Sequence, residues 1–276
     1  MLSLFDGISC GQVALERAGI DVDNYFASEI DKHAIKVTQS NYPDTIQLGD
    51  VRDIDCSELP KIDLLIGGSP CQGFSYIGKH LNFEDPKSKL FFEYARILNE
   101  CNPTYFMLEN VRMKKEYMDV ITETIGVEPI EINSSLVSAQ SRPRIYWTNI
   151  PNVEQPTDLG IKLNDVLEDN PTDCWLTESH KKWWDKNKDY QLQKCYSSLD
   201  KEKAICMTAR QYASWNGNYI STDDGIRKLS PIECERLQNL PDGYTDMAST
   251  TQRYKMLGNA WTVGVIEHIF KNMRCI

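Results

Sequence analysis

The sequence lacks several features that would assign it to common classes of protein. It has no apolar run of about 18 residues, so no membrane-spanning helix is predicted. Its first ten residues include no basic segment and too short an apolar stretch for a secretory signal peptide. The nine cysteines include no C-x-x-C pair, which argues against a zinc site and against a disulfide framework. We therefore expect a cytoplasmic protein that needs no metal.

Two nucleotide-binding motifs and an excess of positive charge are also missing. There is no G-x-G-x-x-G dinucleotide fingerprint and no phosphate-binding lysine motif. The formal net charge of −10 argues against a nucleic-acid binder, because phosphate contacts need a basic face. Basic residues do gather at 181–188, 227–228 and 253–255, and a cleft can be locally positive on an acidic protein. Each cluster alone is more typical of a solvated face.

Short apolar runs alternate with helix-like segments over the first 150 residues. Strands are expected at 2–5, 25–28, 62–66, 105–108, 129–136 and 144–147, and helices at 12–18, 32–39, 90–98 and 117–125. This rhythm predicts an α/β fold with a doubly wound, mostly parallel sheet covered on both faces. Ligands of such sheets bind at the carboxyl ends of the strands, so functional residues are expected in the loops that follow them.

The pattern changes at about residue 151. Residues 151–225 show weak periodicity and predict a small, irregular domain. Residues 226–240 predict a helix with Pro231 in its first turn, and a turn at Gly258 precedes a helix over 263–270. The expected organisation is a domain over 1–150, a small domain over 151–225 and a C-terminal segment over 226–276.

Acidic residues follow successive strands in the first domain. The first strand runs into a loop with the sequence Phe5-Asp6-Gly7-Ile8, where glycine lets the backbone approach a ligand. The second ends in Glu29-Ile30, and Asp50-Val51 comes next. Glu29 is placed to bind ribose hydroxyls and Asp50 to bind an adenine amino group, with Ile30 and Val51 packing the ring. Each acid alone is more typical of a helix cap, but together they favour an adenosine site.

A candidate reactive site follows two further strands. Cys71 comes after the rigid Pro70 on a glycine-rich loop, which favours a nucleophilic thiol over a core cysteine. Glu109 emerges from a buried strand, and such a partly desolvated carboxyl can share or donate a proton. In Gln140-Ser141-Arg142-Pro143-Arg144 the arginines alternate and should point the same way, which suits holding a carbonyl or phosphate.

These motifs, in this order, resemble those of the DNA (cytosine-5)-methyltransferases. The resemblance covers the whole chain and rests on Phe5-x-Gly7 with Gly11, Glu29, Asp50, Pro70-Cys71-Gln72, Glu109-Asn110-Val111, Gln140-x-Arg142-x-Arg144 and Gly258-Asn259. Several stretches, among them LSLFDGIS and KLFFEYARIL, look most like the catalytic domain of the animal de novo enzymes. Gln72 and Asn259 follow the bacterial pattern, so we expect a member from a bacterium or a phage, without a regulatory module ahead of its first strand.

The resemblance implies a class I methyltransferase fold, Rossmann-like, that binds S-adenosyl-L-methionine and releases S-adenosyl-L-homocysteine. Phe5 would stack on the adenine, with Asp6, Gly7, Ile8, Ile30, Val51 and Pro70 also lining the cofactor site. Asn259 and Trp261 would close this site, with the C-terminal segment folded back beside the first strand. Residues 1–150 would be the catalytic and cofactor-binding domain, and 151–225 the target-recognition domain.

The resemblance also implies a covalent mechanism on a cytosine flipped out of duplex DNA. Cys71 would attack carbon 6, Glu109 would bind ring nitrogen 3, Arg144 the ring carbonyl and Pro70 the amino group. Arg142 would support the Cys71 loop. Residues assigned to the substrate are Pro70, Gln72, Ser75, Ile77, Arg210 and Gln211, of which Ile77 would enter the gap left in the helix.

Other functions remain open from the sequence. RNA cytosine-5 methylation, a non-catalytic regulatory DNA-binding paralogue and methylation of free nucleotides are the alternatives, although no Cys-Phe-Thr signature of the transfer-RNA enzymes occurs. Intact Cys71, Glu109 and Arg144 argue against the paralogue. Double-stranded DNA is the expected partner. The recognition sequence, a homodimer and a cognate restriction endonuclease are undecided.

Overall fold

The computed structural model of the protein describes residues 1–69, 88–172, 174–211, 213 and 217–273. The chain forms two compact units, each interrupted in sequence. Unit 1 contains Met1–Ile132, Pro143–Gln155 and Ile266–Ile276, and unit 2 contains Asn133–Arg142 and Pro156–Val265. Each unit has a hydrophobic cluster of its own and is described by itself.

Unit 1 is built on a seven-stranded sheet with the order β3-β2-β1-β4-β5-β8-β6. Its strands are β1 (Leu2–Leu4), β2 (Phe26–Ser28), β3 (Ile46–Gln47), β4 (Leu64–Gly67), β5 (Tyr105–Asn110), β6 (Ile130–Asn133) and β8 (Pro143–Thr148). The pairs from β3 to β5 are parallel, whereas β5 and β8 are antiparallel. β2 and β3 lie on one side of β1, whereas β4 and β5 lie on its other side. The order of the strands therefore reverses between β1 and β4, and ligands of such folds bind at this switch point.

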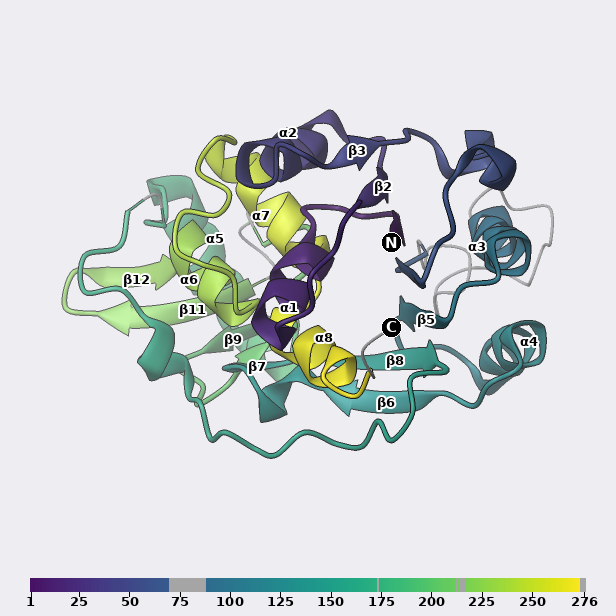
Figure 1. Ribbon diagram of the computed structural model, residues 1–276. Coiled ribbons are helices and arrows are strands. Elements are labelled where there is room, and N and C mark those ends of the chain that lie inside the picture. The colour runs from purple at the N-terminus through teal and green to yellow at the C-terminus, as the bar shows by residue number, and fades with distance from the viewer. Residues whose placement is uncertain (70–87, 173, 212, 214–216, 274–276) are drawn as a thin grey trace. The chain divides into compact units, whose positions relative to one another are not determined.

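Helices cover both faces of this sheet (Figure 1). They are α1 (Cys10–Ala18), α2 (Lys32–Asn41), η1 (Val51–Asp53), η2 (Cys56–Glu58), α3 (Ser88–Cys101), α4 (Lys115–Ile125) and residues 266–270 of α8 (Val263–Phe270). α3 and α4 share a buried cluster with Leu65 of β4. The neighbouring Ile66 faces α1, where a Cβ on Gly11 would lie 2.5 Å from its Cδ1. Since successive strand residues point to opposite faces, α1 lies on the face opposite α3 and α4.

The register of the sheet aligns the ends of four strands. Leu4 pairs with Ser28 of β2 and with Gly67 of β4, and Gly67 pairs with Leu108 of β5. The residues one position further on therefore lie in a row along the carboxyl edge; in sheet order they are Glu29, Phe5, Gly68 and Glu109. This row holds three of the predicted site residues.

Unit 2 contains more regular structure than the sequence indicates. Its elements are η4 (Ser134–Leu136), β7 (Gln140–Ser141), η5 (Leu163–Val166), α5 (Glu178–Gln193), β9 (Ser197–Leu199), β10 (Ala204–Ile205), β11 (Gly217–Thr222), β12 (Gly225–Lys228), α6 (Pro231–Leu237), α7 (Thr250–Asn259) and residues 263–265 of α8. β12, β11 and β9 form one small sheet, and β10 pairs with β7. Trp184 of α5 packs on Tyr219 of β11 with ring centroids 4.2 Å apart.

The predicted α/β class and doubly wound sheet are confirmed, and two local expectations are corrected. The helix expected over 226–240 is limited to α6, because Ser230 caps it and Gly225–Lys228 forms β12. Gly258 lies inside α7 rather than in a turn. No helix in the described part of the chain is long and apolar enough to cross a membrane.

Candidate active site

The loop between β1 and α1 has an unusual backbone conformation. Phe5, Gly7 and Ser9 all have left-handed φ angles, of 56°, 61° and 58°. This conformation is uncommon for an aromatic residue, and such strain concentrates at functional sites. Asp6 anchors the loop by accepting hydrogen bonds from the Ser9 hydroxyl and from the Tyr25 hydroxyl at 2.7 Å. Burial raises the pKa of Asp6 to about 6 despite these bonds.

Glu29 connects this loop to the end of β2. One carboxylate oxygen, Oε2, accepts the Gly7 N–H at 2.9 Å. The other, Oε1, accepts the N–H groups of Ile30 and Asp31 at 2.7 and 2.8 Å. Three backbone donors thus fix the orientation of the carboxylate. Oε2, which accepts only one of these bonds, retains capacity to accept a further hydrogen bond.

Asp50 is fixed by Arg52. Its Oδ1 accepts the backbone N–H of Arg52 at 3.0 Å and its Nε–H at 2.9 Å, and the side chains form an ion pair. These bonds lower the pKa of Asp50 to about 2, so it is ionised at neutral pH. Next to these two acids, Val51 is buried whereas Ile30 is 73% exposed.

These groups fit an adenosine. Glu29 and Asp50 are oriented hydrogen-bond acceptors that follow neighbouring strands, and Ile30 offers an exposed apolar side chain next to Glu29. A ribose needs acceptors for its hydroxyls and an adenine needs an acceptor for its amino group and an apolar surface for its ring. Asp50 would share its carboxylate between the adenine amino group and Arg52. Of the other residues predicted for the cofactor site, Asp6 holds the loop through its hydrogen bonds and Ile8 is buried.

Glu109 and Arg144 form a mostly buried ion pair in unit 1. Glu109 is near the end of β5 and Arg144 lies on the antiparallel neighbour β8. Arg144 Nε lies 2.9 Å from Glu109 Oε1, and the two side chains are only 13% and 11% exposed. A second guanidinium nitrogen, Nη1, donates to the Pro143 carbonyl at 2.9 Å. The pair places a carboxylate and a cation together beside the switch point.

Asn110 connects this pair to the loop that leads to Cys71. Its Nδ2 donates to the Ser69 hydroxyl at 3.2 Å, its Oδ1 accepts the Val111 N–H at 2.8 Å, and its side chain is buried. The start of the loop is therefore attached to the end of β5. The predicted residues Pro70, Cys71, Gln72, Ser75 and Ile77 lie outside the described residues.

Arg142 has a different environment from Arg144. It belongs to unit 2, where it is 3% exposed and donates to three backbone carbonyls. Its Nη1 reaches the Met207 oxygen at 2.8 Å, and its Nη2 reaches the oxygens of Gly258 and Ala260 at 3.1 and 2.9 Å. Arg142 thus joins the segment after β10 to the end of α7. Any support that it gives to the Cys71 loop lies outside the described contacts.

The end of α7 also packs closely on the candidate recognition segment. A Cβ on Gly258 would lie 2.1 Å from the carbonyl carbon of Thr208, which only glycine avoids. Two predicted residues flank this contact in sequence: Asn259 is exposed and Trp261 is half-buried. Of the two candidate recognition residues that follow Thr208, Arg210 is exposed. Gln211 is 2% exposed and packs against Gly217, so its side chain is not at the surface.

The structure thus gathers Phe5, Gly7, Glu29, Asp50, Glu109 and Arg144 in unit 1, and Arg142, Asn259, Trp261, Arg210 and Gln211 in unit 2. Sequence reasoning missed Asn110 and Arg52 as positioning residues. For Asn110 a signal existed, because it is part of the Glu109-Asn110-Val111 motif. For Arg52 the signal was the spacing of two residues from Asp50, which is typical of an acid that caps a short helical turn.

The strand order and the acids at the strand ends define an S-adenosylmethionine-dependent methyltransferase fold. The solved structure of a mutant of Spodoptera frugiperda DNMT2 shares this fold, with a TM-score of 0.72 and 20% sequence identity over 98% of each chain. The sequence profile of the C-5 cytosine-specific DNA methylases matches residues 1–275. The chain therefore belongs to this family, as its motifs predict.

Two bacterial relatives match nearly the whole chain. The type II methyltransferase M1.ScrFI of Lactococcus lactis subsp. cremoris is 32% identical over 302 residues, covering 99% of this chain and 77% of the relative. The type II methyltransferase M.NlaX of Neisseria lactamica is 31% identical over 304 residues, covering 99% of this chain and 96% of the relative. The predicted activity, methylation of DNA cytosine at carbon 5, is thus confirmed at the level of the family.

Proposed function

We propose that this chain methylates carbon 5 of a cytosine flipped out of duplex DNA, with Cys71 as a covalent nucleophile. The observation that carries the proposal is the buried Glu109–Arg144 pair at the end of β5. The strand register aligns Glu109 with Gly68, three residues before Cys71. A cytosine bound beside Glu109 would therefore lie near the start of the loop that carries the nucleophile.

The chemistry follows from the distribution of charge on cytosine. Carbon 5 is a poor nucleophile until the Cys71 thiolate adds to carbon 6 and pushes electrons toward carbon 5. Glu109 shares a proton with ring nitrogen 3 and so stabilises the electron-rich ring. Arg144, oriented by Glu109, donates to the ring carbonyl oxygen. Once carbon 5 carries the methyl group, loss of its proton and of the Cys71 thiolate restores the double bond between carbons 5 and 6 and the aromatic ring.

S-adenosylmethionine supplies the methyl group from its sulfonium when bound. Glu29 would hold the ribose, Asp50 the adenine amino group and Phe5 the face of the adenine ring. Phe5 has a left-handed conformation, and hydrogen bonds of Asp6 and of Glu29 with Gly7 hold the loop that follows it. Asn259 and Trp261 are proposed to close this site.

Residues of unit 2 would read the DNA. Arg210 is exposed and is the candidate for contact with a base. Gln211 is buried, and we propose that it supports the segment that carries Arg210 instead of touching a base. The division into domains at residues 150 and 225, a homodimer and a partner endonuclease stay predictions. The bacterial relatives support the expectation that the enzyme acts in the cytoplasm of a bacterial or phage-infected cell.

A methyl-transfer assay with product identification tests this function. The enzyme is incubated with S-adenosylmethionine and either duplex DNA of mixed sequence or an RNA of the same sequence. The polymers are then digested to nucleosides for mass spectrometry. We expect 5-methyl-2′-deoxycytidine from DNA and no methylated cytidine from RNA. Methylation of the RNA alone would contradict DNA as the substrate and identify the protein as an RNA methyltransferase.

Two variants and a matched control locate the chemistry. Glu109→Gln and Arg144→Lys should each lower the turnover number by roughly 100-fold or more. Arg112 pairs with Glu131 on the surface of the same unit, through an Nε–Oε2 hydrogen bond of 2.6 Å. Arg112→Lys should therefore keep full activity. Equal losses in all three variants would contradict a specific role for Glu109 and Arg144.

A further inference from the structure

Two cysteine thiols meet in unit 1, in a place that the methylation mechanism does not use. Cys56 lies in η2 and Cys101 is the last residue of α3. Their sulfur atoms are 3.0 Å apart although the residues are 45 positions apart in sequence. Both are free thiols and both are partly exposed. A disulfide bond is about 2.05 Å long, so the two sulfurs need to approach by only about 1 Å.

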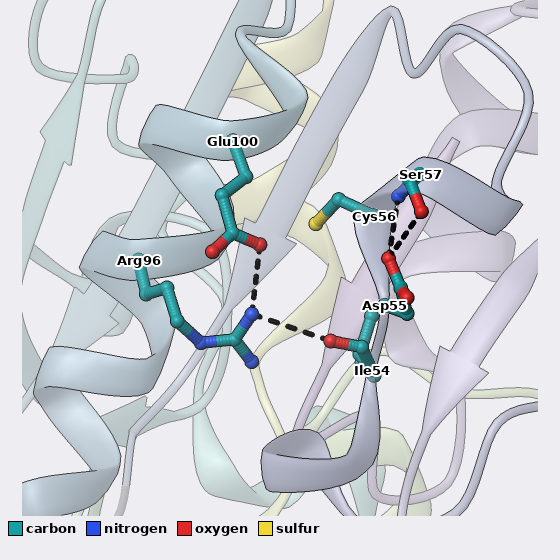
Figure 2. Close-up of a pocket in the computed structure, with 6 residues that line it drawn as sticks. All are labelled: Ile54, Asp55, Cys56, Ser57, Arg96 and Glu100. Atoms are coloured by element: carbon teal, nitrogen blue, oxygen red, sulfur yellow. Dashed lines mark hydrogen bonds and ion pairs between the residues drawn. The ribbon is translucent and has the colours of Figure 1, made fainter.

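The environment of the pair gives access to a small reagent (Figure 2). Cys56 lines an open surface cavity of about 550 Å³, together with Ile54, Asp55, Ser57, Arg96 and Glu100. Figure 2 shows the sulfur of Cys56 pointing toward α3, the helix that carries Arg96 and Glu100. A cavity of this volume has room for a molecule as small as hydrogen peroxide next to Cys56.

The two segments that carry the thiols are already attached to each other. Arg96 of α3 donates to the backbone oxygens of Ile54 and Val51 at 3.2 and 3.3 Å, and to Glu100 at 2.8 Å. α3 is therefore attached to the chain immediately before Cys56. Closing a bond between the sulfurs would leave these contacts in place, because the residues that flank Cys56 do not have to move away from α3.

We propose that Cys56 and Cys101 are a site of reversible oxidation, which closes to an intramolecular disulfide within the folded enzyme. With a peroxide as oxidant, the Cys56 thiolate attacks one peroxide oxygen and becomes a sulfenic acid, releasing the other oxygen as water after protonation. Cys101 then displaces the sulfenic oxygen, which leaves as a second water, and the S–S bond forms. Two thiols are oxidised and one peroxide is reduced to two waters. A dithiol reverses the step.

The pair is expected to stay reduced under mild conditions. Burial, the Cys101 thiol and the Glu100 carboxylate raise the pKa of the Cys56 thiol, and burial raises the pKa of Cys101 as well. Few thiolates are present at neutral pH, and the thiolate is the reactive form. Oxidation is therefore best driven at pH 8.5 and with excess peroxide.

A bond here would constrain the chain that follows the proposed cofactor acid. Cys56 is six residues after Asp50, and Cys101 ends the helix on which that segment packs. The bond closes a long loop in the unfolded chain, which stabilises the folded state. Since the native contacts are retained, we expect the affinity for S-adenosylmethionine to stay within about twofold of the reduced enzyme, while the thermal transition rises by roughly 5–15 °C.

The experiment is peptide mapping of the whole folded enzyme after peroxide treatment. The oxidised protein is alkylated, digested without reduction and analysed by mass spectrometry, and its thermal transition is recorded before and after dithiothreitol. We expect one dominant linked pair of peptides, containing Cys56 and Cys101, and a rise in the transition that dithiothreitol reverses. Activity is not the readout, because oxidation of Cys71 would lower it as well.

Variants separate this site from general oxidation. Cys56→Ser and Cys101→Ser should lose the thermal shift, whereas Cys195→Ser, which removes an exposed thiol of unit 2, should keep it. If a serine variant does not fold, the peptide map of the unaltered enzyme still tests which two cysteines are linked. Separate oxidation of the two thiols, a link that forms only in urea, or links shared at random among the cysteines would overturn the proposal. None of these outcomes depends on methyl transfer.

Discussion

Removing either Glu109 or Arg144 alone should destabilise the fold strongly, although the net contribution of the intact pair is small. Two opposite charges about 4 Å apart attract each other by about 4 kcal/mol at an effective dielectric constant of 20. The desolvation of both groups offsets much of this attraction. With side chains only 11% and 13% exposed, removal of one partner takes this ion pair from a charge that stays mostly buried. We expect Glu109→Leu and Arg144→Met each to lower the free energy of unfolding by about 3–5 kcal/mol.

The double variant distinguishes this account from simple loss of packing. Glu109→Leu with Arg144→Met removes both buried charges together, so its cost should fall short of the sum of the single costs by about 2 kcal/mol or more. The assay is urea unfolding of all four proteins, followed by circular dichroism. The exposed pair of Lys61 and Asp63, 2.8 Å apart, is the matched control and should show a coupling below about 1 kcal/mol. Costs at Glu109 and Arg144 that simply add would refute the reasoning.

Three further predictions follow from single contacts. Gly258→Ala should lower the free energy of unfolding by about 2 kcal/mol or more in urea, because the new Cβ would lie 2.1 Å from the carbonyl carbon of Thr208. Asn110→Ala should lower the turnover number by about 10-fold or more, since it frees Ser69 at the start of the nucleophile loop, while leaving the calorimetric affinity for S-adenosylmethionine unchanged. Asp6→Asn should change the pH dependence of stability. The pKa of Asp6 is raised from 3.8 to about 6 on folding, so the folded state holds more protons between these values and loses up to about 3 kcal/mol as pH rises from 4 to 7. The variant should lack this loss.

Each of these predictions has an outcome that would contradict it. An alanine at Gly258 that leaves stability unchanged would mean that α7 and Thr208 are not in close contact. Weaker cofactor binding in Asn110→Ala would indicate a general effect on unit 1 instead of on the loop. A constant stability difference between Asp6→Asn and the unaltered protein at pH 4.5 and pH 7 would show that Asp6 is not buried in its neutral form.

Much of unit 1 is predictable from the sequence because the central strands β1, β2 and β4 are fully buried. In β4, Leu64, Leu65 and Ile66 form an uninterrupted apolar run, as parallel strands covered on both faces require, and the loop with the predicted nucleophile follows in sequence. The acids Glu29 and Asp50 and the carboxyl of Glu109 are therefore placed correctly at strand ends by position alone. Their partners on the backbone, such as the N–H of Gly7, follow only from the folded loop.

Unit 2 is less predictable, and the reason is physical. α5 carries lysines, aspartates and asparagine on most of its surface, and among its residues only Trp184 and Gln191 are buried, so the helical period of apolar residues is faint. The partners of Arg142 lie 65, 116 and 118 residues away in sequence. No local pattern indicates such contacts, and the alternation of Arg142 and Arg144 along the chain does not reveal that they bind different groups.

The central claim is that Cys71 bonds covalently to carbon 6 of a cytosine in DNA, and trapping that bond tests it most directly. Short duplexes with 5-fluorocytosine in random sequence contexts are incubated with the enzyme and S-adenosylmethionine, beside Cys71→Ser and an RNA of the same sequences. The fluorine blocks the final loss of the carbon-5 substituent, so the adduct should accumulate. We predict a denaturant-resistant complex with DNA only, absent in Cys71→Ser, whose trapped DNA gives the recognition sequence. No adduct on DNA, despite measurable binding of S-adenosylmethionine, would contradict the covalent mechanism.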